Sequence, residues 1–190
     1  DFSVNAASWD HIRSLHVPEL AVETAMREAV GTRLFGSFLD LGTGTGRLLE
    51  LFAPLYQRGV GVDLSTAMLA VARTNLSRAG VTHAQIRQGD IYNLNLPRDS
   101  FDLVTIHQVL HYLDEPARAI AEAARVLRPG GRLLVVDFAP HELEFLRERH
   151  AHRRLGFDRA SIAGWLADAG LKAEKVRDLR PEKGAGDKLT

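Results

Sequence analysis

The sequence has no cysteine, no surplus of either charge and no long apolar run. Without cysteine the chain can form no disulfide, no thiolate metal site and no cysteine nucleophile. Its 24 basic and 24 acidic side chains cancel, so it lacks the basic surplus that gives a protein non-specific affinity for nucleic acid. Its apolar runs fall short of the roughly 20 residues that span a bilayer, and it shows no charged-then-apolar leader. These absences predict a cytoplasmic domain that itself binds neither nucleic acid nor membrane.

The length of 190 residues suits one α/β domain, and 45% apolar with 25% charged residues is ordinary for a globular protein. The chain opens at Asp1 without methionine and stops in a polar stretch at Thr190. We interpret it as part of a longer protein; a trimmed full-length protein is the alternative. Residues 1–36 are predicted to be a lead-in and a helix that covers a cofactor site, and residues 37–190 the main domain.

Short apolar runs alternate with helical stripes along the chain. Strands are predicted at Ser37–Leu41, Gly59–Val62, Ala84–Gln88, Phe101–Ile106, Arg132–Phe138 and Leu171–Val176. Helices are predicted at Val17–Val30, from Leu48 to near Pro54, and at Thr66–Ala79, Pro116–Leu127, His141–Arg153 and Asp158–Ala169. The fourth helix is expected to be closed by Arg128-Pro129-Gly130-Gly131. This alternation predicts a doubly wound α/β fold with a mostly parallel sheet.

A glycine loop follows the first predicted strand, in the sequence Asp40-Leu41-Gly42-Thr43-Gly44-Thr45-Gly46. A glycine turn between a strand and a helix is where a doubly wound sheet binds a nucleotide-like ligand. The spacing differs from the G-x-G-x-x-G of a dinucleotide loop, and Asp40 would repel a pyrophosphate. The same carboxylate would attract a ligand that carries an ammonium and a sulfonium. We therefore predict S-adenosylmethionine (SAM) as the ligand and disfavour an NAD-dependent oxidoreductase.

Two further acids, Asp63 and Asp90, end the second and third predicted strands. Asp63 is placed to accept hydrogen bonds from both ribose hydroxyls, and Asp90 suits the exocyclic amine of adenine. Leu64, Met68 and Ile91 are expected to sandwich the adenine ring. Either acid alone would more often cap a helix, but three acids at successive strand ends favour a binding site.

These segments resemble class I SAM-dependent methyltransferases, in the branch of the ubiquinone and menaquinone biosynthesis enzymes. The resemblance rests on DLGTGTG, VGVDLS, QGDI, FDLVTIHQVLHYL and RVLRPGGRLLVVDF. It implies a Rossmann-like sheet of seven strands in the order 3-2-1-4-5-7-6, with an antiparallel last strand that could begin at Leu189-Thr190 and be truncated. It also implies that Asp40, Gly42 and Gly44 contact the methionine part, that Asp63 binds the ribose, and that Asp90 and Ile91 bind the adenine. Thr43, between the two glycines, is also expected to bind the cofactor.

A closer resemblance links the chain to bacterial proteins that join an ArsR-type winged-helix regulator to a methyltransferase-like domain. It rests on NAASWDHIRSLHVPE and on residues 107–157. This resemblance implies the C-terminal part of a transcription factor, with DNA bound through a missing N-terminal domain, and a homodimer. The domain would then sense SAM or its product S-adenosylhomocysteine (SAH), with little or no catalysis.

Methyl transfer needs little beyond alignment in a water-poor pocket, so no obvious catalytic group is required. His107 and His111, after the fourth strand, are the candidates for a base or an acceptor-orienting group, and His107 is also expected against the cofactor. Packing is the alternative for both histidines. Histidines four residues apart can chelate a metal, with Asp137 as a third ligand beside His107 and His111, but no metal site is predicted. The sequence also lacks the Asn/Asp-Pro-Pro-Tyr/Phe signature of amino-methylating enzymes, so a small-molecule acceptor is expected.

Overall fold

The fold comes from a computed structural model, which describes residues 19–107, 109–137 and 159–172. Five parallel strands form one sheet in the order β3-β2-β1-β4-β5. They are β1 (Phe35–Leu41), β2 (Tyr56–Asp63), β3 (Ala84–Gln88), β4 (Phe101–His107) and β5 (Leu127–Val136). The order reverses between β1 and β4, as in a doubly wound sheet. The predicted α/β fold is therefore confirmed.

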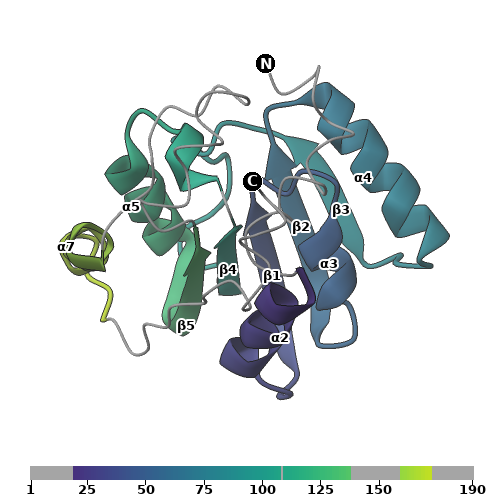
Figure 1. The fold of residues 1–190 in the computed structure, drawn as a ribbon, viewed down its shortest axis with the longest axis horizontal. Coiled ribbons are helices and arrows are strands. Elements are labelled where there is room, and N and C mark those ends of the chain that lie inside the picture. The colour runs from purple at the N-terminus through teal and green to yellow at the C-terminus, as the bar shows by residue number, and fades with distance from the viewer. Residues whose placement is uncertain (1–18, 108, 138–158, 173–190) are drawn as a thin grey trace, which may run out of the picture.

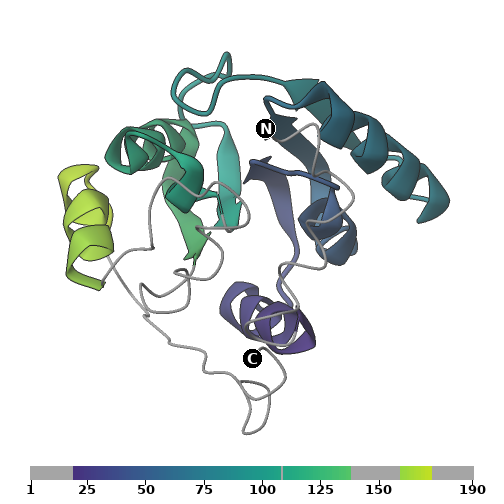
Figure 2. The same cartoon turned by 45° about the horizontal axis from the view of Figure 1, so that its top comes forward.

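Helices cover both faces of this sheet (Figures 1 and 2). They are α2 (Glu19–Val30), α3 (Arg47–Leu51), α4 (Thr66–Arg78), α5 (Pro116–Val126) and α7 (Arg159–Asp168), with a 3₁₀ turn, η2, at Leu110–Tyr112. Side chains of α5 and α7 pack with one apolar cluster, while α2, α3 and α4 contribute to another. Alternate strand residues serve the two clusters: Leu39 and Leu41 face the first, and Phe38 faces the second.

Helix α2 is fastened to the sheet and belongs to the same core. It buries Val22, Met26 and Val30 in the second cluster. Arg132 of β5 donates to the carbonyl oxygens of Ala29 and Val30, at 3.0 and 2.8 Å. These bonds satisfy carbonyls that the last turn of a helix leaves without partners. The predicted boundary after residue 36 falls inside β1, which begins at Phe35.

The segment Arg128–Gly131, expected to separate the helix from a strand that starts at Arg132, lies within β5, which begins at Leu127 directly after α5. The strand registers explain the error: Phe101 pairs with Leu127, and Leu103 pairs with Arg132, so the segment is an irregularity within the strand. Gly130 there has a φ of +80°. Arg128 donates to Asp102 of β4 at 3.0 Å, which holds the bulged segment against its neighbour.

Other predicted elements differ at their ends or lie outside the described residues. β2 begins at Tyr56, three residues before the predicted Gly59. Tyr56 is buried, but the two residues after it are exposed, so they interrupt the apolar run that marks the strand in the sequence. The third-strand and first-strand predictions agree within two residues. Of the predicted strand Leu171–Val176, the two described residues are not in a strand. The helix His141–Arg153 and the strand at Leu189-Thr190 lie outside the described residues.

Candidate cofactor-binding site

Asp40 lies at the carboxyl end of β1 with only 2% of its surface exposed. One carboxylate oxygen accepts a 2.8 Å hydrogen bond from the Thr43 hydroxyl. The other accepts a 2.7 Å bond from the hydroxyl of Thr105 on β4. A buried carboxylate needs such donors to offset its desolvation. Asp40 therefore carries a fixed acidic group where β1 and β4 meet, the point at which the strand order reverses.

The glycine loop turns beside this acid and brings its backbone close to other elements. Gly42 has a φ of +67°, and its N–H donates to the Val62 carbonyl at 2.8 Å. A Cβ at Gly42 would lie 2.4 Å from a methyl carbon of Val109, so only glycine fits. Gly44 has a φ of +55°, a conformation that glycine adopts at little cost.

Asp63 at the end of β2 is tied to the same loop. Its two oxygens accept hydrogen bonds from the backbone N–H groups of Gly44 and Ser65, each at 2.9 Å. Burial raises the pKa of Asp63, and the backbone bonds from Ser65, Gly44 and Leu64 oppose that rise. The carboxylate of Asp63, which is predicted to bind the ribose, is thus held in place partly by the backbone of the glycine loop.

One pocket opens at the carboxyl ends of β1, β2 and β4, and most of the predicted site residues line it. Nearly all the predicted cofactor contacts line it, namely Asp40, Gly42, Thr43, Gly44, Asp63, Leu64, Met68, Ile91 and His107. Met68 and Ile91 are buried, whereas Leu64 is exposed. The three apolar side chains expected around an adenine ring therefore line the same pocket, and their contact with adenine stays a prediction.

Asp90 lies apart from this set. It is exposed and does not line the pocket. Its carboxylate accepts a 2.9 Å bond from the Tyr92 backbone N–H, and its backbone forms a bridge with Asn93. Asp90 thus stabilises its own loop, the local role weighed against ligand binding, and adenine binding by Asp90 stays a prediction.

Described residues at the end of β4 and after it also line the pocket. His107 ends β4 and lines the pocket, while His111 lies in η2 and its side chain lies outside the described structure. Tyr112 also lines the pocket, and its pKa is raised by burial and by the nearby Asp137 carboxylate. Within the described residues, no group of three or more His, Asp or Glu side chains is arranged to hold a metal ion.

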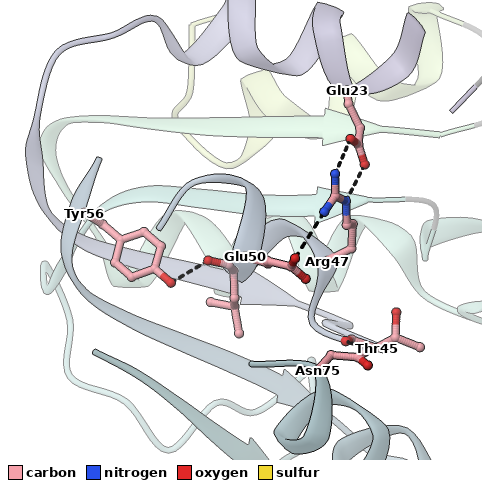
Figure 3. A network of polar contacts seen from close by, with 7 residues as sticks. Glu23, Thr45, Arg47, Glu50, Tyr56 and Asn75 are labelled. Atoms are coloured by element: carbon pink, nitrogen blue, oxygen red, sulfur yellow. Dashed lines mark hydrogen bonds and ion pairs between the residues drawn. The ribbon is translucent and has the colours of Figure 1, made fainter. Parts of the chain in front are cut away.

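Sequence reasoning missed several pocket residues, which are Thr45, Arg47, Leu48, Val62, Gly89, Tyr92, Val109, Tyr112, Leu113 and Asp114. Arg47 carries the strongest missed signal, since it directly follows the glycine loop. Figure 3 shows its guanidinium facing two acids. Nε and Nη2 each donate to Glu23 of α2 at 2.6 Å, and Nη1 lies 3.6 Å from Glu50.

Figure 3 also shows Tyr56, Thr45 and Asn75, which make two further hydrogen bonds near the glycine loop. The Tyr56 hydroxyl donates to the Leu49 carbonyl at 2.6 Å. Burial raises the pKa of Tyr56, and the Asp40 carboxylate adds to the rise. The Asn75 amide of α4 donates to the Thr45 carbonyl at 2.9 Å. The first bond ties β2 to α3, and the second ties the glycine loop to α4.

The site defines a class of protein: an α/β domain that binds a nucleoside-containing cation at its strand-order reversal. A buried acid beside a glycine turn suits an ammonium, Asp63 suits a ribose diol, and the apolar side chains suit a base. The methyltransferase domain family matches residues 39–135 of the chain. The chain belongs to this family of SAM-dependent methyltransferases, and SAM is its cofactor.

Known relatives agree with this assignment. The chain is 37% identical over 105 residues to the uncharacterized methyltransferase YcgJ of Bacillus subtilis, covering 55% of this chain and 42% of that protein. It is 34% identical over 122 residues to the ubiquinone/menaquinone biosynthesis C-methyltransferase UbiE of a Marinomonas species, covering 62% and 49%. The crystal structure of YcgJ superposes with a TM-score of 0.70 at 29% identity, over 77% of this chain and 66% of that one.

The chain spans about half the length of the curated relatives it matches. It also resembles an uncharacterized 37.1 kDa protein in transposon Tn4556 of Streptomyces fradiae, at 32% identity over 169 residues. That match covers 81% of this chain and 48% of that protein. Among the described residues, no helix is long and apolar enough to cross a membrane.

Proposed function

We propose that the chain is a catalytic domain that transfers the methyl group of SAM to a small-molecule acceptor. The observation that carries this proposal is a single pocket with two unlike walls. The glycine loop, Asp40 and Asp63 form one wall, and His107, Val109, Tyr112, Leu113 and Asp114 form the other. A methyl group held by the first wall would face an acceptor held by the second.

The residues of the first wall would hold the cofactor. Asp40 would attract the ammonium of its methionine part, with Gly42 and Gly44 allowing close approach of the backbone. Asp63 would accept bonds from the ribose hydroxyls, and the three apolar side chains described above would enclose the adenine. When bound, SAM supplies an already activated methyl group, so the protein's task is to align the acceptor and exclude water.

The second wall would receive the acceptor. His107 is placed as a base or as an orienting group, since it lines the pocket at the end of β4. Tyr112 and Leu113 add an aromatic and an apolar surface to the same wall. Such a mixture of apolar surface and few polar groups is typical of small-molecule sites. His107-Gln108-Val109-Leu110 stands where amino-methylating enzymes carry their Asn/Asp-Pro-Pro-Tyr/Phe signature.

The test follows the label from methyl-labelled SAM. The protein is incubated with the filtered low-mass fraction of a cell extract and, separately, with DNA, RNA and protein fractions. We expect label in low-mass products and SAH formation that depends on that fraction. Label in a macromolecular fraction alone would contradict the small-molecule proposal.

A second candidate is a SAM- or SAH-sensing domain of an ArsR-type regulator. It is supported by the resemblance at residues 5–19 and by a match to only 48% of the Streptomyces fradiae protein, which leaves room for a second domain. A regulator of this kind would change its DNA affinity by linkage when the ligand binds. Tight SAH binding with no label transferred to any fraction, and DNA binding by the longer protein that SAH shifts, would favour this candidate.

A further inference from the structure

The strand β3 and its neighbour α4 carry a local excess of positive charge. The charges of the whole chain cancel, but between Asp63 and Asp90 there is no aspartate or glutamate. This acid-free run contains both α4 and β3. Its arginines, Arg73, Arg78 and Arg87, are all exposed. A basic surface therefore lies at the β3 end of the sheet, in a chain whose net charge is zero.

The outer edge of β3 directs backbone groups away from the sheet. Within the described ranges, β2 is the only strand beside β3, which ends the sheet next to α4 (Figure 1). The Gly59 N–H donates to the His83 carbonyl at 2.9 Å, and the Gly89 N–H donates to the Asp63 carbonyl at 3.1 Å. Backbone groups of every second residue thus face β2, and those of the residues between them, such as Ile86, face outward. An edge of this kind is a template for an added strand.

Arginines flank this edge on both faces of the sheet. Arg73 of α4 donates from Nη2 to the outward carbonyl of Ile86 at 3.4 Å. The Ile86 side chain packs on the α4 side, in the same cluster as Leu76. Arg87 is the next residue of β3, so its side chain lies on the opposite face, where it donates to Gln85 at 3.0 Å. A strand added at this edge would therefore meet a guanidinium on either face.

A groove between α4 and β3 adds an apolar contact to the same surface. Leu76, Val81, Ala84 and Ile86 line it together with Arg73. One apolar side chain of an added strand would enter this groove, while the next would point to the other face and reach Arg87. In recognition by strand addition, main-chain hydrogen bonds supply affinity and pockets for alternate side chains supply specificity.

We propose that the β3 edge binds an acidic, extended segment of a partner protein, which pairs with β3 as an added strand. This surface goes beyond the proposed function, because the groove shares no lining residue with the cofactor pocket. A second copy of the chain fits less well, since it would bring the same arginines together and like charges repel. A nucleic-acid strand also fits less well, because the acid-free run contains no Phe, Trp or Tyr on which bases could stack.

The test titrates the full chain into a fluorescein-labelled nonapeptide of alternating valine and glutamate and follows fluorescence anisotropy. Three probes of matched length serve as controls. A valine–lysine peptide reverses the charge, a proline–glutamate peptide keeps the charge but loses N–H groups needed for strand pairing, and a single-stranded oligonucleotide is a different polyanion.

The same peptide is titrated with the double variant Arg73→Glu/Arg87→Glu. Its matched control is Arg33→Glu/Arg98→Glu, which changes two exposed arginines outside the acid-free run. We expect the edge variant to bind the valine–glutamate peptide about tenfold more weakly than wild type, since each reversal replaces an exposed ion pair by a like-charge pair. Binding by the control variant should stay within about twofold.

Hydrogen exchange on wild type gives a readout that needs no variant. The Ile86 N–H faces outward, whereas the Arg87 N–H faces β2 by the same alternation. Saturating valine–glutamate peptide should therefore slow exchange at Ile86 and leave exchange at Arg87 nearly unchanged.

Peptide binding with protection of Ile86, weakened in the edge variant alone, supports the proposal. No binding of the valine–glutamate peptide, or equal binding of the valine–lysine peptide, would overturn it. Equal binding of the proline–glutamate peptide or the oligonucleotide, without protection of Ile86, would show a general anion-binding surface and would also overturn it. An equal loss in the Arg33→Glu/Arg98→Glu control would mean that only net charge matters, which again contradicts a docking edge.

Discussion

The two walls of the pocket are built in different ways. On the β1–β2 side, Asp40 and Asp63 have hydrogen-bond partners on both carboxylate oxygens, drawn from nearby hydroxyls and backbone N–H groups. On the β4 side, the wall consists of larger side chains from a strand end and a short turn, such as His107 and Tyr112. We call the first wall the framework wall, because hydrogen bonds and the glycine turn fix its acids in place. The shape of the second wall depends on which side chains stand there.

The difference accords with a division of labour between the walls. A cofactor shared by a family suits a site whose shape depends on glycine φ angles and short polar bonds. An acceptor that differs between relatives suits a wall whose residues can change without disturbing the sheet. Where Gly42 lies against Val109, the walls touch, so changes there should affect both.

The largest effect is expected where the walls touch. Gly42→Ala places a Cβ 2.4 Å from a Val109 methyl carbon at a φ of +67°. Left-handed strain and overpacking together should cost about 3 kcal/mol of unfolding free energy, measured by chemical denaturation. Val109→Ala in the same chain should restore part of the loss by removing the clashing methyls. A Gly42→Ala variant as stable as wild type would contradict this contact.

A smaller effect is expected for the framework wall alone. Asp63→Ala should weaken SAM binding by about 1.5–3 kcal/mol, the range for losing hydrogen bonds to a charged group. Tyr112→Phe, on the other wall, should leave the SAM affinity near that of wild type and lower methyl transfer instead. Calorimetry and a turnover assay on both variants test the contrast. Unchanged SAM affinity in folded Asp63→Ala would show that the ribose is placed wrongly.

The Glu23–Arg47 ion pair, which joins α2 to the start of α3, should contribute less to the free energy of unfolding. Glu23→Gln removes the charge that pairs with Arg47, and we expect a loss of about 1–2 kcal/mol of unfolding free energy, since the arginine is partly exposed. Thr24→Ala is the matched control, because the Thr24 hydroxyl bonds only within α2, to the Leu20 carbonyl. Denaturation midpoints that fall equally in both variants would refute a specific role for the pair.

The smallest effect should appear at the opposite end of the sheet, as a pH dependence. Burial acts to raise the pKa of Asp102, but bonds from the Ser37 N–H and Arg128 lower it below its ordinary value of 3.8. A depressed folded pKa means that Asp102 adds stability above the unfolded pKa and loses it as pH falls through the folded pKa. At pH 7, Asp102→Asn should cost under about 1 kcal/mol. Thermal melts should show the difference from wild type shrinking below about pH 4, and a constant difference down to pH 2 would oppose this account.

The same contrast explains how much could be predicted from sequence. The alternation of apolar runs predicts the parallel sheet. The glycine loop and the strand-end acids predict the pocket with Asp40, Gly42 and Asp63, because a glycine turn and an acid at a strand end are both visible in the local sequence. Asp90 follows the same pattern of a strand-end acid, yet its carboxylate caps the Tyr92 N–H. The sequence pattern does not distinguish a ligand-binding carboxylate from one that caps a loop, since the same carboxylate is the acceptor in both.

What sequence could not predict depends on contacts between distant residues. Arg47 lies at the pocket with Glu23, which precedes it by 24 residues on another helix. Val109 lies against Gly42, although 67 positions separate them in the sequence (109 − 42). The Arg128–Gly131 segment was expected to close the helix, since Pro and Gly interrupt regular structure, whereas it lies within β5 and contacts Asp102 of β4. Each of these three features involves a contact between residues far apart in the sequence, which a local pattern does not reveal.

The central claim is that the framework wall binds SAM. Titration calorimetry of the chain with SAM and SAH in parallel tests it most directly, with Asp63→Ala as the site control. The account predicts micromolar binding of at least one ligand by wild type and clear weakening in the variant. No binding of either ligand by a folded wild-type chain would contradict it.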